Sequence, residues 1–262
     1  MMTKIYRLSI VGTLLALSLS AHAWNYDSQA STTTHSMQIR VGAELNKKWD
    51  NGLRLGLGED LRSDVYNSMT GAAFRTSFTT LSLGYTPIEY VKFDIGYTLK
   101  FTNKDTSAVN KLLRHRAFAS VTGTYKNDYI KLTLRERVLM EARTDSVNPL
   151  EKSRYAWQLR SKLGAEFYLK DQPVKPYVWL EFINTLNAPE YQQKNGHQFI
   201  STIRTQAGIK WRLTKMSSLD FYYRFTYSYD RDINITKKKG LIQLTEETLY
   251  QHAIGVIYNL DW

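Results

Sequence analysis

Six basic residues recur at every second position in three consecutive segments of the chain. They are Arg114 and Arg116, Arg135 and Arg137, and Arg160 and Lys162. Residues two apart lie on the same face of a β-strand. Guanidinium groups bind carboxylate, sulfate or phosphate through paired hydrogen bonds. We therefore predict that these side chains form an anion-binding surface, provided that three strands present them to a shared space.

The chain around these cations alternates between apolar and polar residues, as such strands require. Residues 91–101 place an apolar side chain at every odd position and a polar residue or glycine at every even position. Residues 37–45 and 219–229 have the same period of two. This alternation predicts β-strands with one apolar and one polar face.

Short turns and long polar loops separate the predicted strands in strict alternation. Asn51-Gly52 is a strong hairpin signal between two alternating segments. Longer polar loops are predicted at residues 63–73, 103–113, 141–153, 184–197 and 230–247. Outer-membrane barrels have short periplasmic turns and longer external loops, whereas soluble sandwiches do not need this alternation.

These features predict an all-β fold, a transmembrane antiparallel β-barrel. Eleven strands are visible, but single-chain bacterial barrels have even numbers. We therefore assign residues 24–29 to a short first strand and 30–35 to a Ser/Thr-rich loop, which gives twelve strands. Alternatively, the N-terminal segment occupies the lumen or its mouth. Aromatic residues beside the short turns predict a girdle at the periplasmic rim: Trp49, Tyr85, Tyr125, Phe167, Trp211, Phe221 and Trp262.

The last strand of the chain ends on an aromatic residue. Tyr258, Leu260 and Trp262 share its apolar face. This pattern resembles the C-terminal strand of bacterial outer-membrane barrels. The resemblance implies that these residues form the signal that the barrel-assembly machinery reads.

The N-terminus has the features of an export signal. Lys4 and Arg7 precede a short apolar run at 10–19, and Ala21-His22-Ala23 is a small-x-small cleavage site. We predict a signal peptide at 1–23 and one outer-membrane barrel domain at 24–262. The chain has no Cys, which excludes a disulfide framework and a thiolate metal site.

The predicted lumen carries more cations than acids, within a chain of formal net charge +11. By parity, the inward cations are Arg40, Arg54, Arg62, Lys92, Lys100, Arg114, Arg116, Lys131, Arg135, Arg137, Arg160, Lys162, Arg204, Lys210, Arg212 and Arg224. The inward acids are Glu44, Asp60, Asp94, Glu166, Glu181 and Asp220. Burying the surplus without partners would be prohibitive, so the lumen should hold water or anions. A small anion-preferring diffusion channel for acidic solutes and a plugged structural or interaction barrel are both compatible with this pattern.

Two families resemble this chain. Over most of the mature chain it is similar to an uncharacterised outer-membrane barrel family, domain of unknown function 2490. The similar segments are Leu45-Asn46-Lys47-Lys48-Trp49, Leu113-Arg114-His115-Arg116, Leu134-Arg135-Glu136-Arg137, and Lys175-Pro176-Tyr177-Val178 followed by Glu181. That family has no known activity. By architecture only, the chain is similar to oligogalacturonate-specific porins, which are twelve-stranded barrels with Arg-lined lumens.

Other functions find less support in the sequence. Neither His115 nor His252 has the His-x-Ser spacing of outer-membrane phospholipases, so a lipid-modifying enzyme ranks third. No nucleotide, cofactor or metal motif is visible. The signal peptide and the inward cations argue against nucleic acid. The basic residues at 237–239 are expected to be solvated or to contact lipopolysaccharide. Lipopolysaccharide and outer-membrane lipid are the predicted lipid partners of the barrel.

Overall fold

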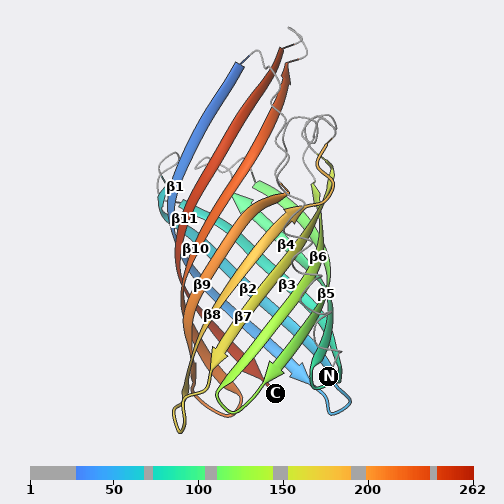
Figure 1. The fold of residues 1–262 in the computed structure, drawn as a ribbon, viewed down its shortest axis with the longest axis vertical. Coiled ribbons are helices and arrows are strands. Elements are labelled where there is room, and N and C mark those ends of the chain that lie inside the picture. The colour runs from blue at the N-terminus through green and yellow to red at the C-terminus, as the bar shows by residue number, and fades with distance from the viewer. Residues whose placement is uncertain (1–27, 68–72, 104–110, 144–152, 190–198, 237–240) are drawn as a thin grey trace, which may run out of the picture.

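Eleven β-strands form a closed barrel in the computed structural model, which describes residues 28–67, 73–103, 111–143, 153–189, 199–236 and 241–262 (Figure 1). In chain order they are β1 (Ser28–Lys48), β2 (Leu53–Asn67), β3 (Ala73–Ile88), β4 (Val91–Asn103), β5 (Lys111–Lys126), β6 (Ile130–Arg143), β7 (Tyr155–Phe167), β8 (Val174–Thr185), β9 (Ile200–Arg212), β10 (Ser217–Thr236) and β11 (Leu241–Asp261). Strands adjacent in the chain pair antiparallel, and parallel pairing of β1 with β11 closes the barrel. The predicted all-β barrel class is confirmed.

The strand number is eleven among the described residues, not the predicted twelve. Residues 24–27 of the predicted first strand lie outside the described residues, and residues 28–29 belong to β1. The predicted loop 30–35 is also part of β1. Its Thr residues favour extended backbone, and β11 supplies a parallel partner over nineteen residue pairs. This parallel ladder closes the barrel without a further strand.

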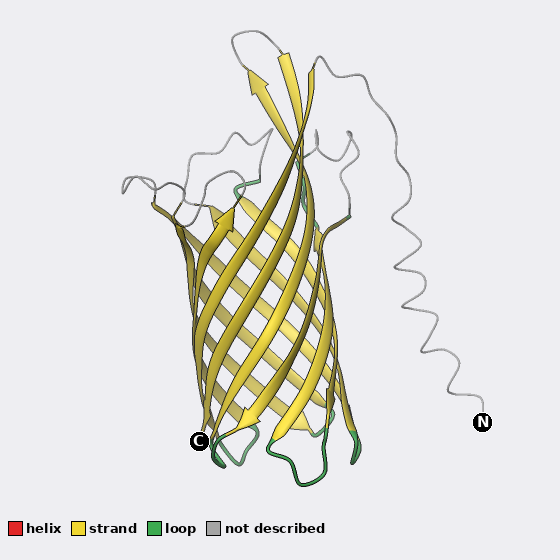
Figure 2. Cartoon of the chain, turned by 90° about the vertical axis from the view of Figure 1, so that its left-hand side faces the viewer, coloured by secondary structure: helices red, strands yellow, loops and turns green. Residues whose placement is uncertain are grey.

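The predicted loop 230–247 is mostly strand as well. β10 and β11 continue as a hairpin beyond the rim that the other strands form, and β1 continues beside them (Figures 1 and 2). In this extension Ile233 pairs with Leu244 and Ile235 pairs with Ile242. The β-branched residues within a polar sequence sustain the ladder where the sequence predicted a loop.

The two ends of the barrel differ, as the alternation of turns and loops predicted. Short turns join β1 to β2, β3 to β4, β5 to β6, β7 to β8 and β9 to β10 at the end where the C-terminus lies (Figure 2). We call this end the short-turn rim and the opposite end the loop-side rim. At the predicted Asn51-Gly52 turn, Gly52 has a φ of 84° and its N–H donates to Trp49 O at 3.1 Å. A left-handed residue of this kind favours glycine.

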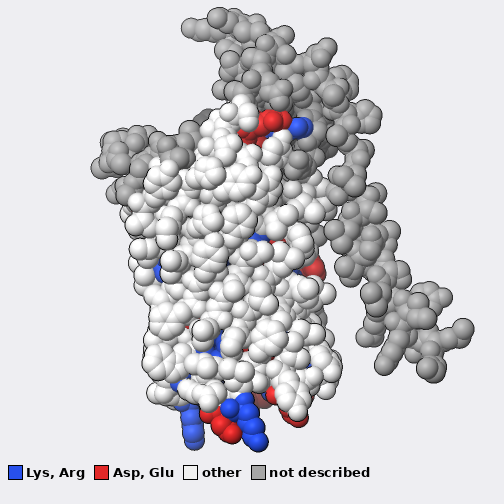
Figure 3. Space-filling view, turned by 60° about the vertical axis from the view of Figure 1, so that its left-hand side comes forward, with Lys and Arg blue, Asp and Glu red and all other residues white. Residues whose placement is uncertain are grey.

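The barrel is polar inside and apolar outside. Among the described residues the buried set contains sixteen polar or charged residues and eight apolar ones. Large exposed side chains such as Ile39, Leu57, Leu81, Ile95 and Leu163 cover the outer wall. The wall carries few charged side chains between its two ends (Figure 3). This reversal of the usual soluble pattern follows from the parity of the strands.

The predicted aromatic girdle is present at the short-turn rim. All seven of its residues are exposed: Trp49, Tyr85, Tyr125, Phe167, Trp211, Phe221 and Trp262. Further exposed aromatic side chains lie toward the loop-side rim, among them Tyr66, Phe74, Tyr155 and Trp157. Within the described residues, no helix has the length and apolarity needed to cross a membrane.

Candidate functional site

The lumen contains two adjoining cavities. The central cavity has a volume of about 650 Å³, and eleven Lys or Arg side chains line it against five carboxylates. The short-turn cavity has a volume of about 340 Å³, with four cations and three carboxylates in its lining. Lys162, Trp179, Lys210 and Arg224 line both cavities. The surplus of positive charge therefore belongs mainly to the central cavity.

The strand register divides the six predicted cations into separate groups. Arg116 lies opposite Glu141 in the β5–β6 ladder, whereas Arg135 lies opposite Thr122. Six residues separate Arg116 from Thr122, which places the two arginine positions about 20 Å apart along the strand direction. Arg137 and Arg135 instead face β7, where their register partners are Arg160 and Lys162. Arg114 and Arg116 are thus set apart from Arg135 and Lys162, and Arg137 and Arg160 lie between these two pairs.

Arg114 and Arg116 converge on Glu141, a buried carboxylate near the loop-side rim. Arg114 Nη1 lies 2.8 Å from Glu141 Oε1, and Arg116 Nε lies 2.5 Å from Oε2. Lys100 Nζ is 4.0 Å from the same carboxylate. The sequence assigned Glu141 to a loop, but β6 continues to Arg143 and points this side chain inward. Extending the alternation by one inward position would have found it.

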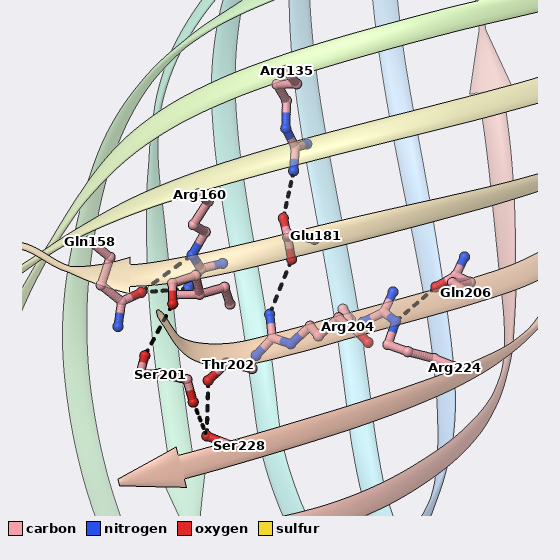
Figure 4. A network of polar contacts seen from close by, with 12 residues as sticks. Arg135, Gln158, Arg160, Glu181, Ser201, Thr202, Arg204, Gln206, Arg224 and Ser228 are labelled. Carbon is pink, nitrogen blue, oxygen red and sulfur yellow. Dashed lines mark hydrogen bonds and ion pairs between the residues drawn. The ribbon is translucent and has the colours of Figure 1, made fainter. Parts of the chain in front are cut away.

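A second buried carboxylate, Glu181 on β8, joins a cation from β9 with one from β6, two strands away on the other side (Figure 4). Arg135 Nη2 lies 2.9 Å from Glu181 Oε1, and Arg204 Nη1 lies 3.4 Å from Oε2. All three side chains line the central cavity. Of the six predicted cations, Arg135 is the one that Glu181 neutralises.

The remaining three predicted cations have no carboxylate within 4.0 Å among the described residues. Arg160 donates from Nη2 to Gln158 Oε1 at 2.9 Å (Figure 4). The Arg137 guanidinium lies 4.0 Å from the ring centroid of Phe118, and Lys162 Nζ lies 3.9 Å from the ring of Trp179. An aromatic face attracts a cation without cancelling its charge. Arg137, Arg160 and Lys162 therefore line the central cavity without a described carboxylate partner.

Two other predicted lumenal acids, Asp60 and Asp94, each serve two cations. Asp60 pairs with Arg40 and with Arg62, the latter at 2.7 Å. Asp94 pairs with Arg54 at 2.9 Å and Lys92 at 3.0 Å. Sharing one carboxylate between two cations leaves net positive charge at both places.

One further buried acid near the loop-side rim was missed by the sequence. Asp64 accepts from Gln38 Nε2 at 2.8 Å and from Arg75 Nε at 2.5 Å. It lay in a predicted loop, yet β2 continues to Asn67. Neither Asp64 nor Glu141 lines either cavity.

Aromatic rings on one wall lie against glycines instead of filling the lumen. Tyr177 faces Gly208 in register, and Tyr222 lies between Gly208 and Gly255. A Cβ at Gly255 would lie 2.2 Å from Cζ of Tyr222, and one at Gly208 would lie 2.6 Å from the Tyr177 hydroxyl. The sequence showed these residues only as inward small or aromatic positions. Because the register places a glycine beside each tyrosine, the large rings can pack along the wall next to the cavities.

The predicted assembly residues lie on the outer face near the short-turn rim. Tyr258 and Trp262 are exposed, and Leu260 is half-buried. Trp262 N–H donates to Asn46 O at 3.0 Å, and Lys48 N–H donates to Trp262 O at 2.8 Å. The terminal residue is thus fixed to β1 by backbone hydrogen bonds.

The two exposed histidine–tyrosine pairs lie on the outer wall. The Tyr97 hydroxyl contacts His115 Nδ1, and the Tyr223 hydroxyl lies 2.6 Å from His252 Nδ1. Within the described residues, no Ser hydroxyl is hydrogen-bonded to either ring, and no group of three or more His, Cys, Asp or Glu side chains could hold a metal ion. Neither pair therefore contains the His and Ser combination that the phospholipase comparison requires.

The closed strand order and the polar, cavity-containing interior define a porin-like β-barrel. A family described as "Protein of unknown function (DUF2490)" matches residues 26–236, and the chain belongs to this family. The chain is also similar to a solved structure of the NanC porin, with 12% identity, a TM-score of 0.45, and coverage of 84% of this chain and 97% of that one. No curated protein matches the sequence.

Proposed function

We propose that the protein is an exported outer-membrane barrel that acts as a small, anion-preferring diffusion channel. The observation that carries this proposal is the group formed by Arg137, Arg160 and Lys162. These three cations line a cavity of about 650 Å³ without a carboxylate within 4.0 Å among the described residues. Fixed positive charges in a narrow polar space attract anions and repel cations. Small acidic solutes are the proposed cargo.

The outer wall supports the membrane part of the proposal. On β7, the exposed rings of Trp157 and Phe167 lie near opposite rims. Ten residues separate them, about 33 Å along the strand, or about 25 Å across the bilayer at a typical strand tilt. This agrees with the height of the apolar band of outer-membrane barrels. Export by a signal peptide at 1–23, assembly through Tyr258, Leu260 and Trp262, and contact with lipopolysaccharide belong to the same proposal.

The test of this function is conductance of the purified barrel in a planar lipid bilayer under a salt gradient. We expect discrete conductance steps with a reversal potential that reports preference for chloride over potassium. Absence of conductance, or preference for potassium, would refute the channel. Fractionation of cells that express the full chain tests the outer-membrane location separately.

A plugged barrel is the second candidate, and contacts near the loop-side rim favour it. We call Glu141 and its partners Arg114, Arg116 and Lys100 the Glu141 centre. Together with the contacts of Asp64 with Gln38 and Arg75, this centre fills the loop-side part of the lumen with buried, mutually satisfied groups. Such a layer can hold water out as effectively as an apolar core. A folded, membrane-inserted protein without conductance would establish this second function.

A further inference from the structure

The two cavities meet at Trp179. Its side chain is 8% exposed and lines both cavities, as do Lys162 and Arg224. Lys162 Nζ lies 3.9 Å from the Trp179 ring, and the Arg224 guanidinium lies 5.1 Å from it. We call these three residues the waist. A solute that moves between the cavities would meet this ring and its two cations, together with the other residues that line both cavities, Glu44, Thr133, Lys210 and Ile257.

Strand register places Trp179 and Arg224 in one row across the wall, and Lys162 lies two residues from the β7 position in that row. Trp179 on β8 lies between Gly164 on β7 and Gln206 on β9, and Gln206 faces Arg224 on β10. A Cβ at Gly164 would lie 2.8 Å from Thr133 Oγ1 and 3.5 Å from Trp179 Cβ. The glycine therefore leaves room for the Thr133 hydroxyl, whereas a Cβ there would make only an ordinary contact with Trp179.

Hydrogen bonds fix the orientation of Arg224. Its Nε donates to Gln206 Oε1 at 2.7 Å, a contact visible in Figure 4. Gln206 Nε2 in turn donates to the Tyr177 hydroxyl at 2.5 Å, and Tyr177 donates to Asp220 Oδ1 at 2.8 Å. This series of hydrogen bonds reaches Arg224 at the Nε atom of its guanidinium. The ion pairs and hydrogen bonds of the described residues leave its terminal nitrogens available to the cavity.

Lys162 is also without an ion pair, although a carboxylate is its register partner. It faces Glu181 in the β7–β8 ladder, yet its Nζ lies over Trp179 and Glu181 binds Arg135 and Arg204. Lys210, which lines the same two cavities, is paired with Glu166 at 2.8 Å. The waist therefore differs from its surroundings by holding two unneutralised cations on one ring.

We infer that Lys162, Trp179 and Arg224 form a binding station for a small anion, such as a halide or the carboxylate of a small acid. The ring attracts both cations but leaves the Lys162 ammonium and the terminal nitrogens of Arg224 without a described acceptor. An anion at this point would accept charge-assisted hydrogen bonds that no described carboxylate provides. The inference rests on the proposed function and deepens it, because it assigns the site at which a permeating anion would bind.

Fluorescence quenching tests the station directly, because Trp179 is the one described tryptophan that is buried. A barrel with Trp24, Trp49, Trp157, Trp211 and Trp262 replaced by Phe reports on Trp179 alone. We expect iodide to quench this emission at least fivefold more efficiently than caesium. Acetate at constant ionic strength should reduce iodide quenching by competition and leave caesium quenching unchanged.

Substitutions in the same background complete the test. Lys162→Met with Arg224→Gln should lower iodide quenching severalfold without changing quenching by neutral acrylamide. Lys210→Met is the matched control and should retain most of the iodide effect, because its charge is already paired with Glu166. Equal quenching by iodide and caesium, lack of competition by acetate, or an equal loss in the control would overturn the inference.

The binding station and the channel can be refuted independently of each other by these two experiments. Saturable iodide quenching in a barrel that does not conduct would retain the station and refute the channel. Anion conductance without preferential iodide quenching would retain the channel and refute the station. Heat-modifiable migration of each variant in detergent confirms that the barrel is folded before either measurement.

Discussion

Two buried glutamates in the lumen, Glu141 and Glu181, have similar partners but different surroundings. Each receives two arginines at hydrogen-bonding distance. Glu141 lies near the loop-side rim and lines neither cavity. Glu181 lines the central cavity, together with four cations that have no described carboxylate partner, Arg137, Arg160, Lys162 and Arg224.

The difference shows that the same ion-pair chemistry has two roles in one barrel. Around Glu141 three cations share one buried carboxylate, so removing that carboxylate leaves buried positive charge without a partner and costs stability. Around Glu181 the surplus cations meet a cavity large enough for water, so their charge acts on solutes. We therefore expect selectivity to depend on the central cavity and stability to depend more on the Glu141 centre.

The largest expected effect is loss of selectivity when the surplus is removed. In a barrel with Arg137→Gln, Arg160→Gln and Lys162→Gln, we predict that the permeability ratio of chloride to potassium falls to near one. The reason is that the substitutions remove three charged side chains without carboxylate partners from the central cavity. Reversal potentials in planar bilayers under a salt gradient measure this ratio.

The matched control for this variant is Arg114→Gln with Arg116→Gln. These arginines line neither cavity, so the permeability ratio should stay close to that of the wild type. Equal loss of selectivity in both variants would remove the functional distinction between the two centres.

The next effect concerns stability. Glu141→Gln leaves Arg114, Arg116 and Lys100 close together without their shared carboxylate. We predict a loss of about 3 kcal/mol in the free energy of unfolding, as expected when one partner of a buried ion pair is removed. Urea titration of the barrel in lipid vesicles, followed by tryptophan fluorescence, measures the change. A midpoint equal to that of the wild type would contradict it.

The corresponding change at the other centre should act mainly on permeation. Glu181→Gln removes a negative charge from the central cavity, so we predict that chloride preference rises by roughly twofold. Water in the cavity can solvate Arg135 and Arg204, so the loss of stability should be smaller than for Glu141→Gln. Bilayer recordings and urea titration of both variants give the comparison. A lower chloride preference in Glu181→Gln would show that the carboxylate itself takes part in anion passage.

The sequence predicted most of the fold because strand parity is a local property. The alternating segments correspond to described strands, and the short turns lie together at one rim. The strand number required information that parity does not contain. Parallel pairing of β1 with β11 joins the two ends of the chain, and nothing in the Ser/Thr-rich segment 30–35 indicates that partner.

The site was harder to predict, because parity gives the face of a strand but not the register between strands. All six predicted cations point inward, yet Arg114 and Arg116 are paired with Glu141, and Arg135 with Glu181. Glu141 was missed because it lies at a strand end, where boundaries are least certain from sequence.

Ionic strength gives the smallest expected effect and separates the two centres without any substitution. The screening length is about 10 Å at 0.1 M salt and about 3 Å at 1 M. In the central cavity, mobile ions can approach Arg137, Arg160 and Lys162, so chloride preference should decline as salt is raised. The Glu141 side chain is 7% exposed and its partners are in contact, so ions cannot enter between them. The difference in urea midpoint between wild type and Glu141→Gln should therefore change little over the same range. If salt reduced that difference as strongly as it reduced selectivity, the Glu141 centre would also be open to solution, and the proposed contrast between a closed and an open part of the lumen would be wrong.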